Sequence, residues 1–438
     1  AVRYPGGNFV SCYDWRDGVG PVENRPRRLE IAWRAIETNE VGTNEFMKWA
    51  RKAGIEPVFA VNLGTKGIEN AVSLVEYCNM EGGTYYSDLR KEHGVEIPYG
   101  IKTWCLGNEM DGDWQIGHKT AQEYGRLAQE TAKAMKQVDA DIKVVSCGSS
   151  KSDMKTYPDW EAETLKYTYP YVDYISLHQY YGGQEMGTES FLSQSLDMED
   201  YIKTVIGTCD YVKAWHRSDK TIYISFDEWG VWSVPDKEVA ASVDASPWQV
   251  APHLSEQIYT MEDALLFAGM MMNFLKYADR IKIACQSLLT NISAAIMTKE
   301  EGEVWVQPIY YPFMHMANYG SGKVLQGVDE IPAYDCALRK QVPYVDYVVV
   351  HNEEKKEVVL FAVNRMEGEM AEIALELQGF EAVRVIEHVT MHSLDKKATN
   401  LENHERVKPE QSDTSSLAQG VLTSRLPALS WNMVRIAI

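Results

Sequence analysis

Continuous runs of hydrophobic residues recur through the first two thirds of the chain, and each run ends in polar residues. They predict seven β-strands, over residues 2–8, 56–64, 101–109, 142–148, 172–181, 221–229 and 280–291. Hydrophobicity without alternation is typical of strands that are buried on both faces. We therefore expect a parallel sheet that is covered by helices.

Segments with helical periodicity lie between these runs. We expect helices over residues 43–54, with Thr43 as the cap and Gly54 as the stop, over 120–137 and over 262–278. Strands that alternate with helices over this length predict an α/β protein with a (β/α)8 TIM barrel. Seven strands are visible where a barrel needs eight, and the residues AVR at the start of the sequence run straight into the PGGN turn as the end of a strand does. We therefore expect that one βα unit or more is missing from the front, either by truncation or because it is a separate chain.

The pattern changes after about residue 320, where hydrophobic and polar positions alternate. Alternation over residues 344–353, 357–365, 371–379, 382–391 and 429–438 predicts an antiparallel β-sandwich. We expect a long surface loop over residues 400–416. The predicted domains are a catalytic barrel over residues 1–319 and a C-terminal sandwich over 320–438.

Composition narrows the possible partners. The 438 residues carry 43 Lys and Arg against 63 Asp and Glu, a net charge of −20, which argues against nucleic acid as a partner. The 12 Trp and 25 Tyr offer flat faces for sugar rings. Seven scattered cysteines without a CxxC pair suggest reduced thiols in a cytoplasmic protein, and no apolar run is long enough for a membrane span.

Two glutamates end predicted strands in similar settings, Glu109 after TWCLGN and Glu228 after IYISFD. A TIM barrel carries its catalytic groups at the C-terminal ends of strands, and glycoside hydrolysis needs two carboxylates. If the visible strands are the second to the eighth, these glutamates close the fourth and the seventh, on opposite sides of the barrel mouth. One such glutamate could equally point into solvent or form an ion pair, but two favour a glycosidase.

Other residues near these strand ends are candidates for substrate contacts. The amide of Asn108 can donate to a sugar hydroxyl, and His178 can hydrogen-bond in the site. Trp33 and Trp114 can stack on leaving-group sugars. The sequence contains no HExxH or EF-hand pattern, so we expect no metal and no cofactor. We expect Asp111 and Asp227 to be structural hydrogen-bond partners.

The segments PGGNF, WCLGNEMDG, ISLHQYY and FDEWGVW resemble the α-L-arabinofuranosidases of glycoside hydrolase family 51. The resemblance extends from Arg3 through the barrel and, more weakly, into the sandwich. It implies that Glu109 is the general acid/base and Glu228 the nucleophile. It also implies that the residues matching the family's substrate and active-site contacts are Arg3, Asn8, Asn108, Tyr180 and Gln286.

The chain departs from the family pattern in two places. Family members usually carry a further active-site glutamate near the first strand, which has no equivalent here, and Gly230 stands where asparagine is commoner. The resemblance implies a homo-oligomer, commonly a hexamer in related enzymes. It also implies that the family's chemistry needs no metal.

The expected activity is that of a retaining, exo-acting α-L-arabinofuranosidase, which releases L-arabinose from arabinan, arabinoxylan or arabino-oligosaccharides by double displacement. Retention predicts carboxyl groups about 5–5.5 Å apart. The charge of Glu228 is expected to raise the pKa of Glu109. Two alternatives stay open: an endo-glucanase or β-xylosidase on the same scaffold, and a non-catalytic carbohydrate-binding protein that lacks its first strand.

Overall fold

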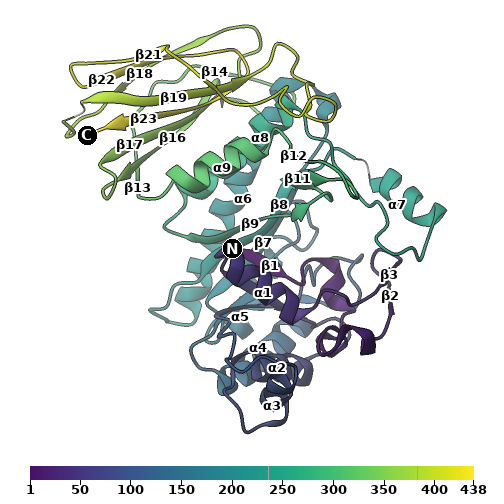
Figure 1. Cartoon of the computed structure of the whole chain (residues 1–438). Helices are drawn as coiled ribbons and strands as arrows, with labels where there is room; N and C mark the ends of the chain where they lie inside the picture. The colour runs from purple at the N-terminus through teal and green to yellow at the C-terminus, as the bar shows by residue number, and fades with distance from the viewer. Residues whose placement is uncertain (235, 382) are drawn as a thin grey trace.

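A parallel seven-stranded sheet forms the centre of the N-terminal part (Figure 1). The computed structural model describes residues 1–234, 236–381 and 383–438. The strands pair in chain order, and each printed pair is parallel. They are β1 (Val2–Tyr4), β4 (Pro57–Val61), β5 (Thr103–Leu106), β6 (Lys143–Cys147), β7 (Tyr174–Tyr181), β8 (Tyr223–Val231) and β9 (Ile281–Gln286).

The sheet is rolled into a nearly closed barrel. Its two edge strands approach each other where the thiol of Cys285 lies 3.9 Å from the carbonyl oxygen of Ala1. Helices lie between successive strands, and they are α1 (Thr43–Ala53), α2 (Ile68–Asn79), α3 (Tyr85–Glu92), α4 (Ala121–Val138), α5 (Asp159–Thr168), α6 (Thr188–Trp215), α7 (Asp236–Ala245) and α8 (Met261–Lys276). This arrangement confirms the predicted TIM-barrel architecture, with seven strands in the described part of the chain.

Burial explains the continuous hydrophobic runs. Strands β4 and β6 are buried at every position after their first residue. Phe59, Trp104 and Phe226, on three different strands, are fully buried in one core that also includes the covering helices. Because both faces of the sheet are covered, a strand such as β4 is a continuous hydrophobic run.

Short elements after several strands build up the mouth of the barrel. The hairpin of β2 (Arg28–Glu30) and β3 (Ala35–Glu37) follows β1, and α7 follows β8. A small sheet of β10 (Leu288–Thr290), β11 (Ala294–Thr298) and β12 (Val304–Val306) follows β9, and α9 (Tyr310–Tyr319) leads away from it. The hydrophobic pattern did not predict these elements, because they are short and partly exposed.

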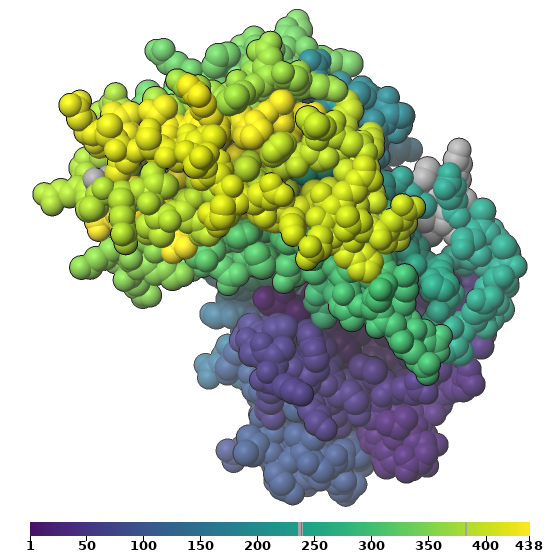
Figure 2. All heavy atoms as spheres, turned by 45° about the horizontal axis from the view of Figure 1, so that its top comes forward, coloured from purple at the N-terminus to yellow at the C-terminus, as the bar shows by residue number. Residues whose placement is uncertain are grey.

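The C-terminal part consists of antiparallel sheets, as predicted. One sheet has the order β13-β16-β17-β23-β19-β20 and the other the order β18-β22-β21, beside a small β14–β15 pair. The strands are β13 (Lys323–Leu325), β14 (Ala333–Tyr334), β15 (Val342–Pro343), β16 (Val345–Asn352), β17 (Glu357–Asn364), β18 (Ala371–Glu376), β19 (Arg384–His392), β20 (Glu410–Gln411), β21 (Ser415–Ala418), β22 (Val421–Leu426) and β23 (Ser430–Ala437). Figure 2 shows this part in yellow on one side of the molecule and the N-terminal residues in purple on the other.

Two local predictions were wrong. The segment 400–416 is not one long loop, because it contains β20 and the beginning of β21. Helix α1 begins at Thr43, so the capping position falls on Gly42. A Cβ atom at Gly42 would lie 1.7 Å from the carbonyl oxygen of Gly18, which leaves no room for a capping side chain.

A buried ion-pair network joins the sandwich to the barrel. Asp346 on β16 accepts hydrogen bonds from Lys276 at the end of α8, at 2.6 Å, and from Arg365, at 2.6 Å. Arg365 also donates to the hydroxyl of Ser195 on α6 at 2.9 Å. Removal of one partner from a buried pair leaves an uncompensated charge, which is strongly destabilising.

We expect Asp346→Ala to lower the free energy of unfolding by about 3–5 kcal/mol, because Arg365 would stay buried without a counter-charge. Urea unfolding followed by tryptophan fluorescence measures this change. Glu353→Ala is the matched control, since Glu353 and its partner Lys323 are exposed and the loss of an exposed pair has little effect. Equal midpoints for the two variants would contradict the prediction.

Among the described residues, the structure contains no helix that is long and apolar enough to cross a membrane. The longest of the described helices, α6, carries charged residues along its length.

Candidate active site

Polar side chains from four strands of the barrel meet at its C-terminal mouth. Glu109 follows β5, His178 and Tyr180 lie on β7, and Glu228 lies on β8. Arg3 reaches this cluster from β1. Parallel strands of a barrel end on one face, so residues far apart in the sequence come together there.

The backbone turns sharply before Glu109. Strand β5 ends at Leu106, Gly107 has a φ of 90°, and Glu109 itself has a φ of 45°. A positive φ is uncommon for a residue with a side chain and is often found at functional sites. The Glu109 carboxylate accepts hydrogen bonds from Trp114 Nε1 at 2.7 Å and, at its other oxygen, lies 3.0 Å from His178 Nδ1.

Glu228 is held by two different donors. The hydroxyl of Tyr180 donates to Oε1 at 2.9 Å, and the guanidinium of Arg3 forms an ion pair with Oε2. Arg3 also donates to Oδ1 of Asn108 at 2.9 Å, so the same guanidinium links the two strand-end segments. Burial and, after it, the charge of Glu228 raise the pKa of Tyr180 well above the usual value, so the hydroxyl stays protonated.

The two glutamates face each other. One carboxylate oxygen of Glu109 and one of Glu228 lie within 4.8 Å of each other, with His178 Nδ1 inside the same radius. Both side chains are largely shielded from solvent, with 10% and 17% exposed.

A set of amide groups lies beside the glutamates. Asn108 Nδ2 donates to Oδ1 of Asn8 at 3.2 Å and to Oε1 of Gln115 at 3.3 Å. Gln115 also donates to the hydroxyl of Ser11. The sequence patterns did not single out Gln115 or Ser11, because neither ends a strand. The motif WCLGNEMDG stops before Gln115. The nearness of this amide side chain to the motif was the signal that could have identified it as a site residue.

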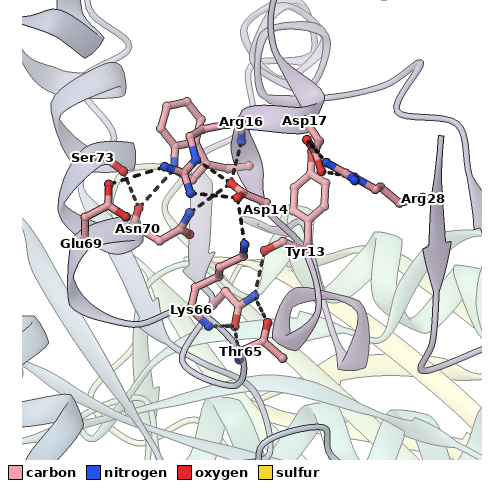
Figure 3. Close-up of polar contacts among 12 residues, drawn as sticks. Tyr13, Asp14, Arg16, Asp17, Arg28, Thr65, Lys66, Glu69, Asn70 and Ser73 are labelled. Atoms are coloured by element: carbon pink, nitrogen blue, oxygen red, sulfur yellow. Dashed lines mark hydrogen bonds and ion pairs between the residues drawn. The ribbon is translucent and has the colours of Figure 1, made fainter. Parts of the chain in front are cut away.

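Polar contacts fasten the segment after β1 to the loop after β4 (Figure 3). The carboxylate of Asp14 accepts from Arg16 Nε at 2.9 Å, from Lys66 Nζ at 3.0 Å and from Asn70 Nδ2 at 3.1 Å. Burial tends to raise the pKa of Asp14, but the bonds from Arg16 and Lys66 hold it well below its usual range. These contacts tie the segment after β1 to the loop after β4 and to the first turns of α2.

His178 lies between two carboxylates. Its Nδ1 faces Glu109, and its Nε2 lies 3.1 Å from Oδ1 of Asp227. Burial lowers the pKa of His178, but the charge of Glu228 and the bonds to Asp227 and Glu109 outweigh burial and raise this pKa to about 10. The carboxylates around His178 therefore favour the positively charged form of the imidazole.

The prediction of a raised pKa for Glu109 was wrong for the free protein. Burial raises this pKa, but the hydrogen bond and charge of His178, the bond from Trp114 and the charge of Arg3 lower it below its usual value. The prediction considered Glu228 alone. The sequence contained no sign that a cationic imidazole would contact the same carboxylate.

Asp227 and Asp111 are both buried hydrogen-bond acceptors. Asp227 accepts from Ser176 Oγ and lies 3.4 Å from the thiol of Cys105, and Asp111 accepts from the backbone N–H of Ser150 at 3.0 Å. Burial raises the pKa of Asp227, but the charge of Arg3 and the bond to His178 lower it to about 2. Asp227 therefore stays ionised beside the imidazole.

The two remaining candidates lie further from this cluster. Trp33 sits in the turn between β2 and β3, where its backbone N–H donates to Glu30 at 2.7 Å. Gln286, at the end of β9, donates its amide to the carbonyl oxygen of Ser293 at 2.7 Å. Among the described residues, no hydrogen bond or ring contact connects either side chain to Glu109 or Glu228.

The spacing of Glu109, His178 and Glu228 would suit a small cation. However, Arg3 already forms an ion pair with Glu228, and a cationic His178 faces Glu109. A metal ion would have to compete with both positive charges. The donor set therefore fits proton transfer better than metal binding.

Two family models match the chain. The α-L-arabinofuranosidase 1 domain matches residues 1–215, and the α-L-arabinofuranosidase C-terminal domain matches residues 227–430. The second match crosses the predicted boundary between barrel and sandwich. Together the two models cover most of the chain.

Similar proteins carry related names. The chain is 54% identical to an intracellular exo-α-(1→5)-L-arabinofuranosidase of Acetivibrio thermocellus, over 99% of this chain and 87% of that protein. It is 40% identical to an exo-α-(1→6)-L-arabinofuranosidase of Bifidobacterium longum, over 99% of this chain and 85% of that protein. A solved family 51 α-L-arabinofuranosidase from Bifidobacterium longum superposes with a TM-score of 0.93 at 38% identity, covering 99% of this chain and 86% of that one.

Proposed function

The chain belongs to the α-L-arabinofuranosidases of glycoside hydrolase family 51, and on this premise we propose that it is a retaining, exo-acting α-L-arabinofuranosidase. The proposal assigns the general acid/base to Glu109 and the nucleophile to Glu228. It rests above all on one observation, the approach of these two carboxylates to within 4.8 Å at the barrel mouth. Retaining glycosidases have carboxyl groups about 5–5.5 Å apart, whereas inverting ones leave room for a water molecule.

In the first step, Glu228 attacks the anomeric carbon of the arabinofuranose ring. Tyr180 and Arg3, which donate to the two oxygens of Glu228, orient this carboxylate and leave a lone pair for the attack. Glu109 protonates the glycosidic oxygen as its bond to the anomeric carbon breaks. The product is a glycosyl ester of Glu228.

In the second step, Glu109 accepts a proton from water, and the water oxygen attacks the same carbon. The ester bond breaks, its electron pair returns to Glu228, and L-arabinose leaves with retained configuration. Asn108 lies beside Glu109 with its amide directed into the same cluster, so we assign it to the sugar 2-hydroxyl. A bond of this kind strengthens in the transition state.

We assign further contacts with the arabinose ring to Arg3, Asn8, His178 and Gln286. The leaving group is proposed to lie on the rings of Trp114 and Trp33. Trp114 suits this position because its indole is bonded to Glu109 and is 44% exposed. The names of the similar proteins support α-(1→5)-linked arabino-oligosaccharides as the preferred substrates, with arabinan as the source polymer.

Methanolysis tests the proposed reaction and its stereochemistry together. With 4-nitrophenyl α-L-arabinofuranoside and added methanol, a retaining enzyme forms methyl α-L-arabinofuranoside, which does not mutarotate. Proton NMR of the product identifies the anomer. The β-anomer would overturn retention, and absence of turnover by the folded protein would overturn the assigned activity.

We expect Trp114→Phe to lower kcat/KM for arabinobiose by about 10- to 100-fold, because a hydrogen bond to a charged group contributes about 1.5–3 kcal/mol. Phenylalanine keeps a ring for stacking, so the loss of kcat/KM measures the contribution of the N–H that Trp114 donates to Glu109. The bond from Trp114 lowers the pKa of Glu109, so the alkaline limb of the pH profile should move to higher pH. Trp215→Phe, at the exposed end of α6, is the control and should match the parent.

We propose three further properties, which concern the location, the domain division and the assembly of the protein. The scattered free cysteines and the word "intracellular" in the names of the similar proteins support a cytoplasmic location. The change from parallel to antiparallel sheets supports a division between residues 319 and 320. A homo-oligomer, a hexamer by family resemblance, can be tested by light scattering.

A further inference from the structure

His178 contacts a carboxylate at each of its ring nitrogens. Nδ1 lies 3.0 Å from Glu109 and Nε2 lies 3.1 Å from Asp227, and all three side chains are buried. The three groups come from different strand ends, β5, β7 and β8. They form one continuous array that begins at the barrel mouth and ends inside the barrel.

The donors and acceptors fix how many protons the array holds. An ionised carboxylate can only accept a hydrogen bond, and a neutral imidazole has one N–H. Two satisfied bonds therefore require two protons among Glu109, His178 and Asp227. Either the imidazole is doubly protonated between two carboxylates, or it is neutral and one carboxyl is protonated.

The surrounding charges favour the doubly protonated imidazole in the free enzyme. Glu228 Oε2 lies 3.7 Å from His178 Nδ1, and its negative charge attracts the proton. Arg3 opposes this effect, but it is already paired with Glu228. Tyr180 and Cys105, the other titratable neighbours, stay neutral because burial raises the pKa of each.

The two ends of the array differ. Asp227 is closed off inside the barrel, where it also contacts Ser176 and Cys105. Glu109 faces the barrel mouth, beside Trp114 and opposite Glu228. A proton that leaves the imidazole toward Glu109 can therefore reach a substrate, whereas a proton on Asp227 cannot.

We propose that His178 stores the catalytic proton of the resting enzyme and passes it to Glu109, with Asp227 as the positioning residue that keeps the imidazole charged. This inference rests on the proposed function. In the first step, the proton moves from Nδ1 to Glu109 and on to the glycosidic oxygen, which keeps the electron pair of the broken bond. The second step returns one proton from water to Glu109 and His178.

The charge of the site stays constant in this scheme. Before the reaction, Glu109, Asp227 and Glu228 are negative and His178 and Arg3 are positive. After the first step, Glu228 is a neutral ester and His178 is a neutral imidazole, so one negative and one positive charge have disappeared together. A buried site thus avoids a change in net charge, which would be costly at low dielectric.

Asp227→Asn tests the role of the buried carboxylate, because it removes the charge and keeps the shape. Loss of this charge should lower the pKa of the array, so the alkaline limb of kcat/KM should move to lower pH by about one unit or more. Turnover of arabinobiose should fall about 100-fold, because its leaving group needs a proton. 4-Nitrophenyl α-L-arabinofuranoside, whose leaving group needs little protonation, should lose less than about 10-fold. Ser176→Ala is the control, since it removes a hydrogen bond to Asp227 and keeps the charge.

An unmoved alkaline limb with an equal loss on both substrates would overturn the proposal. A second measurement does not depend on activity. Side-chain ¹⁵N NMR of the parent enzyme, with His178 assigned by its loss in His178→Gln, should show protons on both ring nitrogens above neutral pH. A singly protonated ring would overturn the proposal, whereas a parent enzyme that turns over no arabinofuranoside would overturn the proposed function instead.

Discussion

Glu228→Gln is expected to lower kcat/KM for 4-nitrophenyl α-L-arabinofuranoside by on the order of 10⁴-fold or more, because no other group can form the glycosyl ester. Glutamine keeps the volume of the side chain and can still accept from Tyr180. The loss therefore reports the missing nucleophile rather than collapse of the site. Release of 4-nitrophenol, with circular dichroism to match the folding of the two proteins, measures the effect.

Two further variants serve as controls for this experiment. Glu185→Gln changes an exposed acid in the loop after β7 and should behave like the parent. In Glu228→Ala, azide can enter the vacated space and attack the anomeric carbon directly, so the product should be the inverted β-L-arabinofuranosyl azide. A folded Glu228 variant with most of its activity would assign the nucleophile to another residue.

Glu109→Ala is expected to separate the two substrates. Arabinobiose has a poor leaving group, so its turnover should fall by about 10²- to 10⁴-fold without the general acid. The aryl arabinofuranoside needs little protonation, so its first step should persist and its second step should become slow. A burst of 4-nitrophenol, equal to the enzyme concentration and followed by slow turnover, is the expected result in stopped-flow measurements.

Azide distinguishes the roles of the two glutamates. In Glu109→Ala it should accelerate the slow second step and give the α-azide, because the glycosyl ester forms first and the configuration inverts twice. The α-azide here and the β-azide from Glu228→Ala would together establish the assignment. Equal losses on both substrates, with no burst and no effect of azide, would contradict the role of Glu109.

The sequence by itself determined the barrel and the strand ends at which the two proposed catalytic glutamates lie. Strands β4, β6 and β8 are buried on both faces, and such burial requires continuous hydrophobic runs that are visible without a structure. Glu109 and Glu228 end or closely follow such runs, and parallel strands bring their ends to one face. Both properties depend on the local sequence. The hydrophobic periodicity of the strands and the position of each glutamate at the end of a run were therefore enough to predict them.

Only the tertiary structure decided how these residues interact. The bond between His178 and Glu109 joins residues 69 positions apart, and the bond between His178 and Asp227 joins residues 49 positions apart. These contacts, and not the strand pattern, make the imidazole cationic and lower the pKa of Glu109. The left-handed backbone of Glu109 and the place of Gln115 beside Asn108 are likewise set by packing. Hydrophobic periodicity records which side of an element is buried, but electrostatics depends on distances between elements, which no local pattern contains.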